Sequence, residues 1–323
     1  MQLSNTTLKK LIHGAYDFKM EKGYLSFCRF SQAQMDFLAQ EDGWCYERAL
    51  HTGGISAKFL TDATSISFDY KLTRGELNDT IDVYVDDKAY YIHRTQEQGL
   101  KGKIELALPM GKKQVTIYFP TDSDVWIKRF NIDGKWRAVK PAKTKLLFIG
   151  DSITQGVGSG LSGQTYVHVF SRIHSYHVLN QGISGHYHDG RLLLPLDEFK
   201  PDKIIIAMGT NDYNRDSFDL THGKVEDRIP AFYKRLNELY GDVPKLLITP
   251  LWRADAAGDL DKFKAFCKRI ANEALQYKNV TVVDGMDLVP PVAECFHDGL
   301  HPSCWGMELY GKNLANKVTQ LKF

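Results

Sequence analysis

The sequence predicts a two-part chain, with an all-β sandwich of jelly-roll type over residues 1–138 and a three-layer α/β/α domain over residues 139–323. Up to about residue 133, β-branched and aromatic residues alternate with polar ones at period two, which is typical of antiparallel strands. Beyond residue 145, short continuous apolar runs alternate with amphipathic segments, as expected for a parallel sheet buried on both faces. A proline- and lysine-rich joint, VKPAKTK, lies between the two patterns at 139–145.

The first half contains several short candidate strands that are separated by Gly, Asp and Asn turns. They are WCYERAL (44–50), SISFDYKL (65–72), TIDVYVDD (80–87), QVTIYFP (114–120) and VWIKRFNI (125–132). Strands of this length at short spacing favour a sandwich or jelly roll. No helical periodicity of useful length occurs in this half, so we expect strands alone.

The second half alternates candidate strands with candidate helices. The strands are KLLFIG (145–150), HVLNQG (177–182), KIIIAMG (203–209), KLLITP (245–250) and NVTVVD (279–284). Amphipathic segments are centred on 164–176, 189–199, 224–240, 259–277 and 305–320. Five such units predict a doubly wound domain with a parallel sheet between two layers of helices.

Composition excludes several classes of protein. The 323 residues are 43% hydrophobic and 25% charged, which is typical of a globular chain. The formal net charge of +2 gives no electrostatic reason to expect nucleic acid or a membrane surface as a partner. The five cysteines show no CxxC spacing, and no apolar run approaches a membrane span or a signal peptide. We therefore expect a cytoplasmic protein with reduced thiols.

Polar groups follow the predicted strands or precede the last helix at four places. Ser152 ends the turn after the first strand of the second half (145–150), and the glycines of 182–185 follow the second strand of that half (177–182). Asn211 follows the third strand, and the pair Asp298 and His301 precedes the final helix. A serine hydroxyl needs a base, an orienting group and oxyanion donors to act as a nucleophile, and open α/β sheets carry such groups at their carboxyl edge.

In their order along the chain, these four blocks resemble those of an SGNH hydrolase, a member of the GDSL esterase/lipase superfamily. They are GDSIT (150–154), the glycine of NQGISG (180–185), GTND (209–212) and DGLHP (298–302). The resemblance covers the second half and implies an SGNH fold that hydrolyses acyl esters. The first half resembles the β-sandwich of two-domain carbohydrate esterases.

The resemblance implies a role for each matched residue. Ser152 would be the nucleophile and, through its backbone N–H, an oxyanion donor. The N–H of Gly185 and the side-chain amide of Asn211 would be the other donors. His301 would act first as general base and then as general acid, and Asp298 would orient its imidazole. In some relatives with a preceding sandwich a backbone carbonyl orients the histidine, and this alternative stays open.

Two further motifs have alternative interpretations. GVGSG at 156–160 follows a strand as a dinucleotide-binding loop does, but its glycines come too late to open a helix directly. The second strand also ends in Asn180, where an acidic ribose ligand would be required. His186, His188 and Asp189 carry metal-ligating side chains, without a second group of ligands in the sequence. We therefore expect neither a cofactor nor a metal.

The sequence says less about the substrate. Trp252 and Arg253 follow the fourth strand of the second half, and His297 adjoins Asp298, so we expect these three residues to bind substrate. A packed loop is the alternative for Trp252 and Arg253. By analogy with carbohydrate esterases, we expect a small-molecule or oligosaccharide ester and, most specifically, O-deacetylation of a carbohydrate.

Two other functions remain open. The first is a lipid-ester or thioester hydrolase of the same superfamily, and the second is a carbohydrate-binding protein with a vestigial hydrolase domain. The sandwich is open to three interpretations: a carbohydrate-binding module, an inert support, or a dimerisation surface that would make the protein a homo-oligomer.

Overall fold

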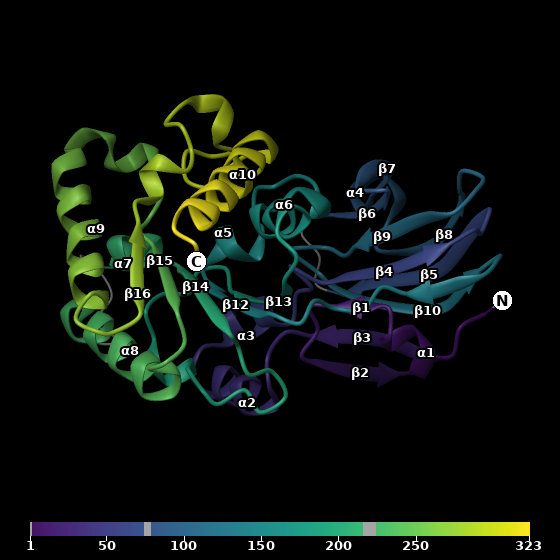
Figure 1. Cartoon of the computed structure of the whole chain (residues 1–323), viewed down its shortest axis with the longest axis horizontal. Coiled ribbons are helices and arrows are strands. Elements are labelled where there is room, and N and C mark those ends of the chain that lie inside the picture. Colours follow the sequence, from purple (N-terminus) through teal and green to yellow (C-terminus); the bar gives the residue numbers. More distant parts are fainter. Residues whose placement is uncertain (1, 74–78, 216–223) are drawn as a thin grey trace.

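The computed structural model describes residues 2–73, 79–215 and 224–323. Figure 1 shows a β-rich half beside an α/β half along the long axis of the molecule, with the N-terminus at the β-rich end. The predicted fold class is confirmed, because antiparallel sheets precede a parallel sheet with helices. The last antiparallel strand is β11 (Trp136–Ala138), and the first parallel strand is β12 (Lys145–Gly150). A domain boundary at residue 138 stays a prediction.

Two antiparallel sheets form the β-rich half. One has the order β1-β4-β9-β6-β7 with β11 paired to β4, and the other has the order β2-β3-β10-β5-β8. The strands are β1 (Ile12–His13), β2 (Asp17–Glu21), β3 (Tyr24–Cys28), β4 (Ser56–Thr61), β5 (Ser65–Thr73), β6 (Thr80–Val85), β7 (Lys88–Arg94), β8 (Lys101–Ala107), β9 (Lys113–Tyr118) and β10 (Asp124–Ile132). Their inner faces meet in one core, in which the rings of Phe68 and Phe130 stack 5.2 Å apart.

The α/β half contains a parallel sheet of order β13-β12-β14-β15-β16. Its other strands are β13 (His177–Gly182), β14 (Lys203–Ala207), β15 (Lys245–Ile248) and β16 (Val280–Val283). Alternate residues of β12 enter opposite cores: Phe148 packs beneath α6 (Tyr166–Ile173) and α10 (Cys304–Gln320), and Leu147 beneath α8 (Val225–Tyr240) and α9 (Leu260–Ala274). Burial on both faces explains the continuous apolar runs in the sequence.

Shorter helices complete the fold. They are α1 (Asn5–Lys9), α4 (Thr95–Gln98), α5 (Ser152–Gln155), α7 (Thr210–Arg215) and five 3₁₀ turns: η1 (Ser162–Gln164), η2 (Gly190–Leu192), η3 (Ala254–Asp259), η4 (Gly285–Asp287) and η5 (Ala293–Cys295). The helix predicted around 189–199 is wrong, because only η2 forms there. Pro195 disfavours a helical conformation in the residue before it, which stops the helix.

The strand predicted at 44–50 is also wrong, as is the expectation that the first half has no helices. In addition to the short α1 and α4, two longer helices form in this half, α2 (Gln32–Glu41) and α3 (Gly43–Ala49). Ser31 and Gln34 make a reciprocal capping box at the start of α2, a signal that is visible in the sequence. The aromatic residues of WCYERAL resemble a strand pattern, but their apolar partners lie outside the sandwich.

Helices α2 and α3 pack on the α/β half. Met35 and Leu38 of α2 and Cys45 of α3 share a small core with Ile183 and Leu192, which lie beyond β13. The apolar faces of these helices are therefore buried against the carboxyl edge of the parallel sheet. This contact places part of the N-terminal half beside the loops that follow β12 and β13.

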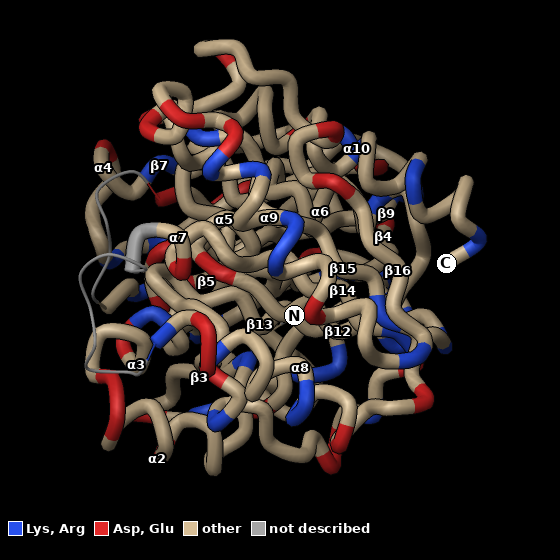
Figure 2. The backbone as a smooth tube through the Cα atoms, turned by 90° about the vertical axis from the view of Figure 1, so that its left-hand side faces the viewer, with Lys and Arg blue, Asp and Glu red and all other residues tan. Residues whose placement is uncertain are grey.

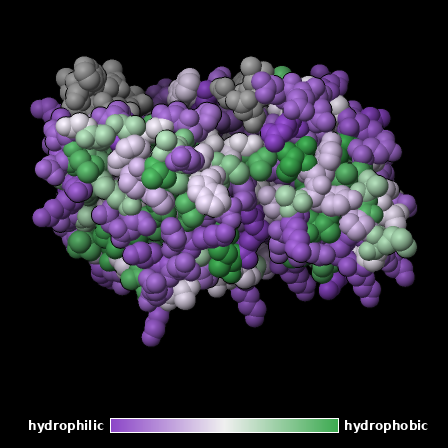
Figure 3. Space-filling model, turned by 90° about the horizontal axis from the view of Figure 1, so that it is seen from above, coloured by the Kyte–Doolittle hydropathy of each residue, from purple (hydrophilic) through white to green (hydrophobic). Residues whose placement is uncertain are grey.

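The surface shows no dominant charge. Figure 2 shows basic and acidic residues interspersed over the α/β end, in keeping with the formal net charge of +2. In Figure 3, apolar side chains on the upper face lie in small groups among polar ones. Within the described ranges, no helix combines the length and apolar character needed to cross a membrane. All five cysteines are free.

Candidate active site

Ser152 lies at the carboxyl edge of the parallel sheet, where β12 ends and α5 begins. Asp151 caps α5 by accepting a hydrogen bond from the N–H of Ile153 at 3.0 Å. Burial raises the pKa of the Asp151 carboxyl to about 7, although the bond from Ile153 opposes this effect. The tight cap fixes Ser152 as the first residue of the helix, with its Oγ facing His301.

His301 joins Ser152 to Asp298. Its Nε2 lies 2.8 Å from the Ser152 Oγ, and its Nδ1 lies 2.7 Å from Oδ2 of Asp298. Burial acts to raise the pKa of Asp298, but hydrogen bonds from His301 outweigh it and lower the pKa to about 2. An ionised carboxylate only accepts hydrogen bonds, so Nδ1 carries the proton and Nε2 is left to accept the serine hydroxyl.

The three residues come together because the segment 296–302 folds back on itself. Oδ1 of Asp298 accepts the backbone N–H groups of Leu300 at 2.9 Å and His301 at 2.7 Å. The N–H of His297 donates to the carbonyl of His301 at 2.7 Å and closes the loop. The close sequence spacing of Asp298 and His301 is therefore what lets one carboxylate orient both the backbone and the imidazole.

The two further predicted oxyanion donors lie on neighbouring loops. Gly185 follows β13 and has a φ of +80°, a conformation that favours glycine. A Cβ at Gly185 would also lie 2.9 Å from Nε1 of Trp44. Asn211 is the second residue of α7, and its Nδ2 donates to the carbonyl of His186 at 2.8 Å. One N–H of the Asn211 amide is therefore fixed, which orients the other.

A cleft of about 600 Å³ opens beside His301. The α/β half supplies the loop 156–162, Ser184 and the residues 297, 298 and 301. The opposite wall comes from the N-terminal half and includes Trp44, Arg48, Asp79 and Asp122. The guanidinium of Arg48 stacks on the Trp44 ring at 4.0 Å, and 58% of Trp44 is exposed. Both halves therefore build the cleft.

The residues expected to bind substrate lie in different surroundings. His297 lines the cleft. Arg253 is buried, donates to the carbonyl of Thr210 at 2.7 Å and pairs with Asp255 at 2.6 Å. Trp252 is half-buried against the ring of Phe296, 5.1 Å away. These contacts are those of a packed loop, and a substrate-binding role for the three residues stays a prediction.

The side chains of the HxHD segment point to separate partners. His188 lies 2.8 Å from the buried carboxylate of Asp212, and His186 lies 3.9 Å from the Cys45 thiol. Asp189 accepts hydrogen bonds from Arg191. In the described part of the chain, no group of three His, Cys, Asp or Glu side chains is arranged to hold a metal ion.

The glycine-rich segment 156–160 runs along the cleft. Gly158 has a φ of +84°, and a Cβ there would lie 2.8 Å from the Cβ of His301. Close packing against the histidine therefore accounts for this glycine without a bound nucleotide.

Sequence reasoning missed the N-terminal wall of the cleft. Trp44 and Arg48 fall within the stretch that was predicted as a strand, which gave no reason to place them near Ser152. The local signals that mark this region as helical are the capping box at Ser31 and Gln34 and the Asp42 side chain, which caps α3 by accepting the N–H of Cys45 at 3.0 Å. The contact of these helices with the loops after β12 and β13 has no local signal.

Comparison with known proteins gives one family match. The model of the GDSL-like lipase/acylhydrolase family matches residues 148–309, which is half of the chain. No curated protein sequence is similar enough to match.

Solved structures match almost the whole chain. The salicylyl-acyltransferase SsfX3 from a tetracycline biosynthetic pathway has a TM-score of 0.75 at 17% identity, covering 100% of this chain and 97% of its own. A GDSL-like lipase from Bacteroides ovatus has a TM-score of 0.72 at 18% identity, covering 96% and 95%. A family two carbohydrate esterase from Clostridium thermocellum, in complex with cellohexaose, has a TM-score of 0.66 at 16% identity, covering 96% and 98%. At these identities the likeness shows the shared two-part fold.

Proposed function

The chain belongs to the GDSL-like lipase/acylhydrolase family, and from this premise we propose that it is a serine ester hydrolase acting through Ser152, His301 and Asp298. The observation that carries the proposal is the unbroken hydrogen-bond relay from Asp298 through His301 to Ser152, with contacts of 2.7 and 2.8 Å. A serine beside a correctly oriented histidine is the arrangement that activates a hydroxyl for acyl transfer.

The reaction follows from the positions of these groups. The Ser152 Oγ attacks the ester carbonyl carbon while Nε2 of His301 accepts its proton. The backbone N–H groups of Ser152 and Gly185 and the second N–H of the Asn211 amide stabilise the oxyanion that forms. His301 then returns the proton to the departing alcohol, and a water molecule activated by the same histidine hydrolyses the acyl-enzyme.

We further propose that the substrate is a short-chain ester of a carbohydrate, most specifically an O-acetyl sugar. Two observations support this. The carbohydrate esterases among the structural neighbours share both halves of the fold, not only the hydrolase half. The cleft of about 600 Å³ is lined by residues of both halves, and charged side chains such as Arg48, Asp79 and Asp122 among them favour a polar alcohol group over a long acyl chain.

The first experiment tests the reaction class. Wild-type protein should hydrolyse p-nitrophenyl acetate, and Ser152→Ala should lower kcat by at least about 10³-fold. Ser159→Ala is the matched control, because Ser159 is a buried serine that lines the cleft and lies outside the relay. Turnover that survives Ser152→Ala unchanged would contradict the proposal.

A second experiment tests the substrate class. The kcat/KM for acetate release from acetylated oligosaccharides should exceed that for p-nitrophenyl acetate. The kcat/KM should also fall as the acyl chain of the ester lengthens from C2 to C12. A maximum at C8 or longer would instead identify a lipid-ester hydrolase. Ester formation with an added alcohol, in place of acetate release, would identify an acyltransferase. Sugar binding without turnover would identify a carbohydrate-binding protein.

A further inference from the structure

The side chain of Gln155 connects the two halves of the molecule at the active site. We propose that Gln155 is a positioning residue, whose amide holds the oxyanion loop (residues 182–185) against the loop 121–123 of the β-rich half. In this way Gln155 aims the N–H of Gly185 at the developing oxyanion. The catalytic part of this inference rests on the proposed ester hydrolysis, and the placement of the loop does not.

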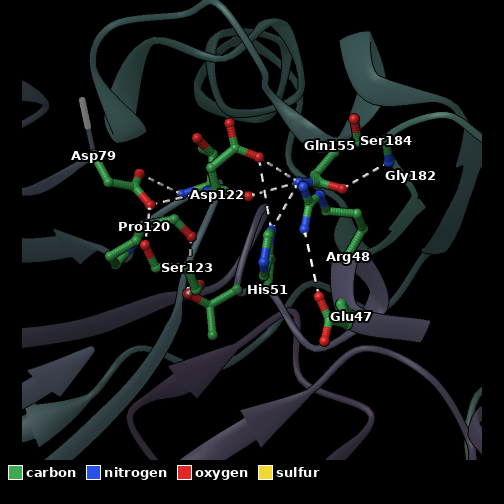
Figure 4. Close-up of polar contacts among 12 residues, drawn as sticks. Glu47, Arg48, His51, Asp79, Pro120, Asp122, Ser123, Gln155, Gly182 and Ser184 are labelled. Carbon is green, nitrogen blue, oxygen red and sulfur yellow. Dashed lines mark hydrogen bonds and ion pairs between the residues drawn. The ribbon is translucent and has the colours of Figure 1, made fainter. Parts of the chain in front are cut away.

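The contacts of Gln155 fix the orientation of its amide. Gln155 is the last residue of α5 and is fully buried, at 0% exposed. Its Oε1 accepts the backbone N–H of Ser184 at 2.8 Å (Figure 4). Its Nε2 faces the Asp122 Oδ1 at 2.7 Å, the Thr121 carbonyl at 3.0 Å and Nδ1 of His51 at 3.2 Å. Because only Oε1 can accept and only Nε2 can donate, the amide has one satisfied orientation.

The bond to Ser184 decides which N–H of the oxyanion loop stays available. The N–H of Ser184 is taken by Gln155, and the N–H of His186 donates to the carbonyl of Ile183 at 3.1 Å. In the described part of the chain, the N–H of Gly185 between them donates to no backbone carbonyl. Gln155 thus binds the residue next to the proposed oxyanion donor and leaves that donor for the substrate.

The loop 121–123 is a firm support for this contact. Asp79 accepts the N–H groups of Thr121 at 2.9 Å and Asp122 at 3.0 Å, together with the Ser123 hydroxyl at 2.6 Å (Figure 4). Burial raises the pKa of Asp79 to about 7, although these hydrogen bonds oppose the effect. The oxyanion loop is therefore braced through Gln155 by a loop that is itself held at three points.

Loss of the Gln155 side-chain amide should lower the rate of the chemical step. Oxyanion donors contribute through preorganisation, so a loop that shifts by a fraction of an ångström stabilises the transition state less while the ground state still binds. The expected signature is a fall in kcat with KM nearly unchanged. A bond that only holds the two halves together would instead change stability and leave kcat intact.

The test compares two buried glutamines that bridge the same halves. Gln155→Ala should lower kcat for p-nitrophenyl acetate by about 10- to 100-fold, less than the loss of an entire oxyanion donor, with KM changed less than about twofold. Gln34→Ala is the control, because Gln34 joins α2 to Gln181 at 3.3 Å and to the carbonyl of Leu192 at 3.2 Å without a hydrogen bond to residues 182–185. It should lower the Tm and keep kcat. Equal losses of kcat in the two variants, or unchanged kcat in Gln155→Ala, would overturn the proposal.

A rescue experiment separates positioning from packing. Gln155→Glu keeps an acceptor for Ser184 but sets a carboxylate against Asp122, so kcat should fall at least as far as in Gln155→Ala. Adding Asp122→Asn restores a donor–acceptor pair at the same 2.7 Å contact and should recover part of the loss, since the carboxylate still faces the Thr121 carbonyl at 3.0 Å. No recovery in a double variant that folds with the wild-type Tm would contradict the proposed role.

Amide hydrogen exchange tests the placement of the oxyanion loop without a measurement of turnover. In Gln155→Ala, exchange in a peptide covering residues 182–187 should be faster by at least about 10-fold, and Gln34→Ala should leave it unchanged. Unchanged exchange in Gln155→Ala would overturn the positioning role even in an active enzyme. Faster exchange in a protein without esterase activity would refute the proposed function and leave the placement of the loop standing.

Discussion

Asp298 contacts His301 twice, through both oxygens of one carboxylate. Oδ2 lies 2.7 Å from the imidazole Nδ1, and Oδ1 accepts the His301 backbone N–H at 2.7 Å. The two contacts fix the ring and the chain that carries it, so the side chain has little freedom to turn away from Ser152. They also lower the pKa of Asp298 to about 2, although burial opposes this, and the carboxylate is therefore ionised at neutral pH.

Asp298→Asn should lower kcat by about 10²- to 10⁴-fold, yet leave more turnover than Ser152→Ala. The asparagine oxygen can still accept one hydrogen bond, but the amide cannot stabilise the imidazolium. Asp287→Asn is the control, because that carboxylate is exposed and, among the described residues, forms an ion pair with Lys317 alone, at 3.5 Å. Unchanged kcat in Asp298→Asn would show that another group, such as a backbone carbonyl, orients the histidine.

Gly185→Ala should lower kcat by about 100-fold, because the new Cβ meets the Trp44 indole and distorts the loop that carries an oxyanion donor. Gly23→Ala separates this effect from backbone strain. Gly23 has a φ of +78°, close to that of Gly185, and a Cβ there meets nothing within 4 Å. It should cost about 1 to 2 kcal/mol of stability and leave kcat unchanged. Equal kcat in the two variants would argue against an oxyanion role for Gly185.

Arg29→Met should destabilise the protein by at least about 3 kcal/mol in urea unfolding, since several buried carbonyls lose their donor. The guanidinium is fully buried and donates to the carbonyls of Gly182 at 2.6 Å, His51 at 2.7 Å and Asn180 at 3.0 Å. Burial lowers its pKa to about 9, so it remains charged at neutral pH.

Arg29→Lys should not restore this stability, because an ammonium group lacks the fork that reaches carbonyls on two halves of the chain. Arg137→Met, at an exposed arginine of β11, should change stability by less than about 0.5 kcal/mol. A small effect of Arg29→Met would show that water replaces the guanidinium without loss.

The buried imidazole of His168 should make stability depend on pH. Burial lowers its pKa from 6.5 to about 3, while the bond from Nδ1 to the Ser162 carbonyl at 2.8 Å acts in the opposite direction. As the pH falls below 6.5, the unfolded chain takes up the proton first, so folded stability should decrease by up to about 1.4 kcal/mol per pH unit.

His168→Asn keeps a donor near Ser162 and removes the titrating group. The free energy of unfolding, measured in urea between pH 6 and pH 4, should therefore fall less steeply than in wild type. A slope equal to that of wild type would mean that His168 does not remain neutral in the folded protein.

Local patterns predict the strands of the parallel sheet, and the sequence motifs single out Ser152, Asp298 and His301, which the structure brings within hydrogen-bond distance. Asp298 and His301 are three positions apart, and Ser152 ends a strand that is apolar on both faces, so short stretches of sequence carry most of this information. The strand prediction at 44–50 failed because a short run rich in aromatic and apolar residues, such as Trp44, Cys45 and Tyr46, does not show which core will bury it. The helix forms because its apolar partners are Ile183 and Leu192.

The contacts of Gln155 and Arg29 could not be predicted from the sequence, because they join residues that lie far apart in the chain. Ser184 lies 29 residues beyond Gln155, and Gly182 lies 153 residues beyond Arg29. A buried glutamine and a buried arginine have no pattern that identifies their partners, because these lie far away in the sequence and many of them are backbone carbonyl and N–H groups. Their roles become visible only when the two halves are placed together.

The close packing between the two halves also limits which halves can be joined in a chimeric protein. A Cβ at Gly53 would lie 2.4 Å from the carbonyl oxygen of Gln155, and one at Gly54 would lie 2.5 Å from the Cβ of Asn180. Neither position has room for a methyl group. A chimera that takes its first half from another family member must therefore have glycine at both positions. Otherwise the first half cannot pack closely against α5, the helix that begins at Ser152. The β-rich half is in this sense not a freely interchangeable module, and exchange of whole halves should fail where the donor lacks either glycine.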